Sequence, residues 1–65
     1  MIDKNGISIN IKLSTDEAVH LVLLTRAVMN NDDFMTYPPR YRSNIIGVYN
    51  KALNSLPDSV KAQLP

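Results

Sequence analysis

The chain has no cysteine and a single histidine, His20, among its 65 residues, and this limits how it can stabilise a fold. A chain of this length buries only about 60% of the surface that its unfolded form exposes, so such domains commonly rely on disulfides, a metal ion or association with a second chain. Disulfides, thiolate ligands and clusters of histidines are excluded within one copy. The sequence therefore predicts one small domain, residues 1–65, that has no cofactor or metal and completes its core by association.

Charge and apolar content narrow the function classes. A hydrophobic fraction of 45% and a net charge of +1 are typical of a folded domain without strong attraction to nucleic acid or to an anionic membrane. The densest apolar run, residues 18–24, is much shorter than a membrane span, and the sequence does not open with the apolar stretch of a secretory signal. Together with the lack of cysteine, this predicts a cytoplasmic protein that does not enter a membrane.

Residues 7–13 alternate strictly between apolar and polar side chains, which is the period of a strand with one buried face. The apolar positions are Ile7, Ile9, Ile11 and Leu13, and the polar positions are Ser8, Asn10 and Lys12. The sequence offers no second strand, and a lone strand leaves its backbone donors and acceptors unpaired. We therefore expect this strand to pair with the same strand of a second copy.

A first helix is predicted over residues 15–30. Ser14, followed three residues later by Glu17, forms the capping-box pattern of a helix start. Apolar residues then surround most of the helix, which is typical of a helix buried on nearly all sides, so a second subunit is again expected. The predicted dimer interface comprises Ile7, Ile9, Ile11, Leu13, Leu21 and Leu24.

A second helix is predicted over residues 39–56, because Pro39 suits the first helical position and Pro57 cannot continue the helix. Its apolar stripe is Tyr41, Ile45, Tyr49, Ala52, Leu53 and Leu56, flanked by Ile46 and Val48. Residues 58–64 are expected to form a short turn of helix that packs back through Val60 and Leu64. The predicted fold is therefore α+β but mostly α, in the order β-α-α, as a strand-paired homodimer.

Catalytic patterns are missing from the sequence, so we expect a protein that is not an enzyme. No acid or nucleophile is placed around His20, which suits the rim of a helix. Asp32 and Asp33 are adjacent carboxylates and fit an exposed turn. The two glycines, Gly6 and Gly47, are too far apart to form a phosphate-binding loop.

One strand followed by two helices is the order of the ribbon-helix-helix DNA-binding proteins, in which two copies pair their strands and insert the ribbon into the major groove. The segment Arg42-Ser43-Asn44-Ile45-Ile46 is similar to that family's Arg-Ser, polar, apolar, apolar pattern. The resemblance implies a dimeric transcriptional regulator. Its base-reading residues would be Ser8, Asn10 and Lys12, and its phosphate-binding residues Arg42 and Ser43. Alternatively, the three strand residues are only the solvated face of that strand.

The loop between the two helices supports a second hypothesis, a protein that binds and modulates another protein through residues 32–42. Aromatic residues, Met and Arg are enriched at protein interfaces, and here they are Phe34, Met35, Tyr37, Arg40 and Tyr41. Tyr37 precedes a proline, and the extended conformation expected there would project its ring away from both helices. The alternative is that Phe34 or Tyr41 fills the core. In style, though not by any motif, such a chain resembles the small inhibitors of phages and mobile elements.

Overall fold

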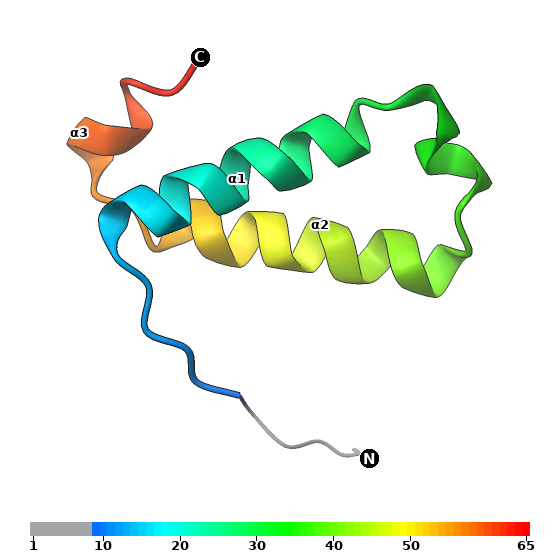
Figure 1. Ribbon diagram of the computed structural model, residues 1–65, viewed down its shortest axis with the longest axis horizontal. Coiled ribbons are helices and arrows are strands. Elements are labelled where there is room, and N and C mark those ends of the chain that lie inside the picture. The colour runs from blue at the N-terminus through cyan, green and yellow to red at the C-terminus, as the bar shows by residue number, and fades with distance from the viewer. Residues whose placement is uncertain (1–8) are drawn as a thin grey trace.

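Residues 9–65 are described by a computed structural model and form a helical hairpin with a short third helix. Helix α1 spans Thr15–Met29, the 3-10 helix η1 spans Asp32–Thr36, α2 spans Pro39–Asn54 and α3 spans Asp58–Lys61. Helices α1 and α2 run antiparallel and side by side, with η1 at the closed end of the hairpin and α3 at the open end (Figure 1).

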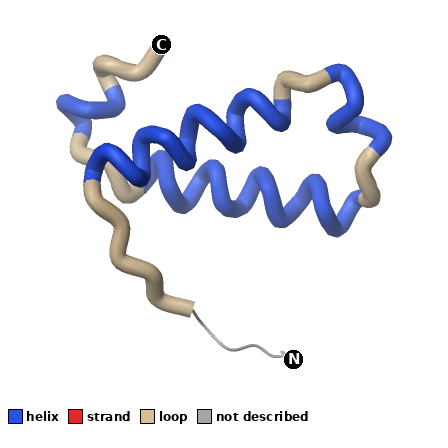
Figure 2. Tube along the Cα trace, in the orientation of Figure 1, coloured by secondary structure: helices blue, strands red, loops and turns tan. Residues whose placement is uncertain are grey.

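The strand predicted over residues 7–13 is wrong, and with it the α+β class and the strand-paired homodimer. Residues 9–14 form no regular structure, and the part of the chain that is described contains helices and loops alone (Figure 2). Ile9 and Ile11 are 80% and 73% exposed, while Ile7 and Ser8 lie outside the described residues. The physical reason is that a strand needs a partner edge, and helices satisfy their backbone groups internally and offer none.

The start of α1 confirms the predicted capping box. The Ser14 hydroxyl accepts a hydrogen bond from the Glu17 amide at 3.1 Å, and the Glu17 carboxylate accepts one from the Ser14 amide at 2.8 Å. The bond from the Ser14 backbone, and then that from its hydroxyl, lower the pKa of Glu17 below its ordinary value. The two hydrogen bonds of the capping box pair the backbone amides of Ser14 and Glu17, which the start of a helix otherwise leaves unpaired.

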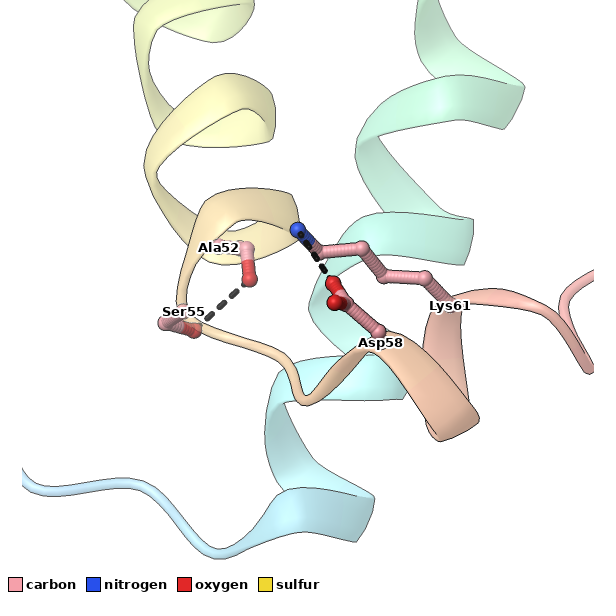
Figure 3. A network of polar contacts seen from close by, with 4 residues as sticks. All are labelled: Ala52, Ser55, Asp58 and Lys61. Atoms are coloured by element: carbon pink, nitrogen blue, oxygen red, sulfur yellow. Dashed lines mark hydrogen bonds and ion pairs between the residues drawn. The ribbon is translucent and has the colours of Figure 1, made fainter.

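The start of α2 also follows the sequence, with Pro39 at its first position. Its end comes two residues before the predicted one. The Ser55 hydroxyl donates to the Ala52 carbonyl at 2.7 Å, and α3 then begins with Asp58, whose carboxylate lies 3.8 Å from the Lys61 ammonium (Figure 3). Leu56 precedes Pro57, and a residue before a proline disfavours the helical conformation, which accounts for the early end.

The core lies between the two long helices and is small. Ala18 and Val22 of α1 pack against Ala52 of α2 and against Leu56, which follows that helix; Val22 alone among these is fully buried, with 0% exposure. Val60 and Leu64 pack against this cluster, which confirms that the C-terminal turn folds back. The carbonyl of Pro65 also accepts a hydrogen bond of 2.6 Å from the Arg26 guanidinium of α1.

The fold is one helix layer thick. It extends 35 × 31 × 15 Å along its principal axes, and a helix with its side chains is itself about 10–12 Å across. Most domains bury their apolar residues between two packed layers. A single layer cannot do so, and large apolar side chains remain exposed on both helices: Leu24 at 63%, Ile46 at 42% and Val48 at 42%.

Candidate functional site at the closed end of the hairpin

The loop that joins α1 to α2 is held by a series of local hydrogen bonds. The Asn31 side chain accepts from the Asp33 amide at 2.8 Å, and the Asn31 carbonyl accepts from the Phe34 amide at 2.9 Å. The Tyr37 amide then donates to the Phe34 carbonyl at 3.1 Å, and Pro38 and Pro39 fix the next two backbone angles. The loop is therefore a defined structure.

Three aromatic rings fasten this loop to the hairpin. Phe34 is 7% exposed and is the buried one of the three, although it is not part of the core cluster between the long helices. The ring of Tyr37 lies edge-on to Phe34, with centroids 6.0 Å apart, and edge-on to Tyr41, with centroids 5.3 Å apart. The backbone of Tyr37 is extended, as expected before a proline. The expected outward projection of its ring is wrong, because the ring packs between its two neighbours and is half-buried.

Part of the same loop points to solvent. Met35 is 71% exposed and Tyr41 is 57% exposed, and Arg40 is exposed as well. We call these three residues the hairpin-end surface. It combines an apolar side chain, an aromatic ring and a cation on a backbone that the buried Phe34 holds in place.

Arg42 lies beside this surface. Its side chain is half-buried, one terminal nitrogen is 3.6 Å from the sulfur of Met35, and its Nε atom is buried without a hydrogen-bond partner. A thioether is a weak acceptor and does not neutralise a guanidinium. The charge of Arg42 is therefore unmatched by any carboxylate of residues 9–65 within ion-pair distance.

The predicted DNA-binding residues are not brought together. Asn10 and Lys12 are exposed on the irregular N-terminal segment, which leaves the hairpin at the end opposite to the start of α2 (Figure 1). Arg42 and Ser43 lie one turn inside α2, whose start is occupied by Pro38 and Pro39. Prolines have no amide hydrogen, so this helix start presents fewer donors to a phosphate than an ordinary one.

The predicted dimer residues have mixed surroundings. Leu21 packs against the core cluster, whereas Leu13 is 45% exposed and Leu24 is 63% exposed. The sequence pattern placed Val48 beside a buried stripe, but it is 42% exposed. The sequence places Val48 at the edge of the apolar stripe of α2. That position alone does not show whether a second layer of structure covers the Val48 side chain.

The remaining ionisable groups form no catalytic arrangement in the described part of the chain. The Nδ1 atom of the exposed His20 is 2.7 Å from the Asp16 carbonyl of its own helix. Asp32 and Asp33 open η1. Across residues 9–65, no group of three or more His, Asp or Glu side chains is placed to hold a metal ion, and no helix has both the length and the apolar character to cross a membrane.

A scan against protein-family models, a search of curated proteins and a search of solved structures each found no match to this chain. The resemblance to the ribbon-helix-helix proteins therefore stays a prediction.

Proposed function

We propose that this chain is a non-enzymatic module that binds a protein partner through the hairpin-end surface. The observation that carries the proposal is the contrast between Phe34, which is 7% exposed, and its neighbour Met35, which is 71% exposed. The first anchors the loop and the second is presented by it. A loop that is already ordered loses little conformational entropy on binding, so more of the contact energy remains as affinity.

The exposed side chains indicate the chemistry of the partner. Tyr and Arg are the residues that most often dominate binding energy at protein interfaces, and Met adapts to irregular apolar surfaces. Arg40 is exposed, and the half-buried guanidinium of Arg42 forms no ion pair with a carboxylate of residues 9–65. A guanidinium forms its strongest hydrogen bonds with carboxylates. The surface therefore suits an apolar patch bordered by Asp or Glu side chains.

DNA binding is the less supported function. It was predicted from a paired ribbon, and residues 9–13 form no strand. The proline pair at the start of α2 also reduces the donors available to a phosphate. On the lack of cysteine, which fits a reducing compartment, we place the module in the cytoplasm.

The proposal is tested by site-specific photo-crosslinking in cells that express the chain. A photoreactive amino acid at Met35 should capture a protein, and the same group at Asn54, an exposed position of α2, serves as the matched control. Capture from position 35, lost when Arg40 is also replaced by Glu, supports the proposal. Equal capture from both positions, or none from position 35, contradicts it.

DNA binding is examined separately by titrating the purified chain with random duplex DNA at several salt concentrations. A steep fall in affinity with rising salt indicates contacts to phosphates. We expect the chain to show no DNA binding of that kind. A steep fall that is lost in Lys12→Ala would favour the regulator function over the protein-binding one.

A further inference from the structure

Helices α1 and α2 share one apolar face that nothing in residues 9–65 covers. Ala18 and Val22 face α2, and Ala52 and Leu56 face α1. Because both helices are right-handed and run antiparallel, the residues to one side of these contacts lie on the same side of the layer. Leu24 of α1 and Val48 of α2 are exposed there, and the half-buried Leu21, Val28 and Ile45 border them. We call them the uncovered face.

The opposite side of α1 is covered by the chain itself. Val19 and Leu23 line a shallow groove together with Val60 and Leu64 of the C-terminal segment, and both are half-buried. Leu23 and Leu24 are neighbours in sequence but differ in exposure: Leu23 is half-buried, whereas Leu24 is 63% exposed. The chain therefore protects one side of the layer and leaves the other to something else.

The middle of the uncovered face carries no charge. Residues 18–25 of α1 and 43–50 of α2 contain no Asp, Glu, Lys or Arg. Interfaces between different proteins commonly use complementary charges to select the partner, and like charges in apposition are costly. A neutral apolar face has no charges with which to select a different protein. When it packs against the same face of a second copy, no like charges are brought together. This charge pattern fits self-association.

The area of the face also fits a dimer. Helices of 15 and 16 residues are each about 22–24 Å long, and two of them side by side are about 20 Å wide, which gives a flat area of roughly 450 Å². The relief of side chains raises this towards the roughly 600 Å² per partner at the lower end of specific interfaces. A contact of this size supports a reversible dimer.

We propose that a second copy of this chain packs on the uncovered face, so that two single layers form one symmetric four-helix dimer. Stacking gives the two-layer architecture that a lone hairpin lacks, and it removes Leu24 and Val48 from water. The contact is made by helices and leaves the N-terminal segment free. It does not depend on the partner proposed for the hairpin-end surface.

Sedimentation equilibrium at micromolar concentrations tests the dimer, with circular dichroism to verify the fold of each variant. The parent should sediment at twice its 7.3 kDa mass. Leu24→Glu and, separately, Val48→Lys should keep their helix content and raise the dissociation constant by at least about 30-fold, as for an interface hot spot. Ile11→Glu is the control, because Ile11 is exposed but lies on the N-terminal segment; it should remain a dimer.

Three outcomes would overturn this proposal. They are a parent that stays monomeric at the highest micromolar concentration, a dimer that survives both face substitutions, and a dimer that dissociates only in Ile11→Glu. Met35→Ala should leave the mass unchanged, so failure of the dimer and failure of the hairpin-end site are distinguishable.

Discussion

The ring of Tyr37 meets the ring of Tyr41 edge-on, with centroids 5.3 Å apart and planes inclined at 74°. A second edge-on contact joins Tyr37 to the buried Phe34. Tyr37 thus links the residue that anchors the loop to the residue at the exposed margin of α2, and it does so from a half-buried position. Its main role is therefore to hold the hairpin-end surface in shape.

Replacing Tyr37 by alanine should lower the free energy of unfolding by about 1–2 kcal/mol, because edge-on aromatic pairs contribute about 0.5–1.5 kcal/mol each beyond their buried area. Tyr37→Phe keeps both ring contacts and should stay close to the parent. Urea denaturation followed by circular dichroism measures both variants. An alanine variant as stable as the parent would show that the ring does not hold the loop.

The buried centre of the hairpin gives a second prediction. Val22 is 0% exposed, and Val22→Ala removes two carbon atoms from a fully buried side chain. Each contributes about 0.8 kcal/mol or somewhat more, so we expect the free energy of unfolding to fall by about 2 kcal/mol. Ile11→Ala, at a position 73% exposed, should change stability by less than about 0.5 kcal/mol. Equal losses in the two variants would contradict the described core.

Gly47 lies inside α2, and a β-carbon built on it meets nothing within 4 Å. Alanine is favoured over glycine in a helix interior by about 1 kcal/mol, so Gly47→Ala should raise the midpoint of thermal unfolding. A lowered midpoint would mean that another molecule approaches the backbone at this position.

Stability should also depend on pH through Glu17. Its pKa is lowered in the folded state by hydrogen bonds from Ser14, relative to an ordinary value of 4.5. A depressed pKa means that the contribution is complete above pH 4.5 and is lost as the pH falls through the lower folded-state pKa. Glu17→Gln retains a capping side chain but cannot titrate. The stability difference between parent and variant should therefore shrink below pH 4.5; a difference that grows with acidification would reverse the sign.

The helices were predictable because their signals are local. Ser14 with Glu17, Pro39 and Pro57 mark helix boundaries by chemistry within a few residues, and the observed ends differ from the predicted ones by two residues at most. The absence of the predicted strand could not be foreseen, because the alternation from Ile7 to Leu13 favours an extended segment with one apolar side and says nothing of a partner edge. The packing of the Tyr37 ring and the exposure of Val48 likewise depend on tertiary neighbours, which no local sequence pattern encodes.

Hydrogen–deuterium exchange of the chain, alone and bound to the protein captured at Met35, tests the central claim most directly. The account predicts that added protection on binding is concentrated in residues 32–42, where the loop carries Met35, Arg40 and Tyr41. Residues 9–14, which are exposed and irregular, should exchange equally fast in both states. Protection of residues 9–14 with none in residues 32–42 would contradict it.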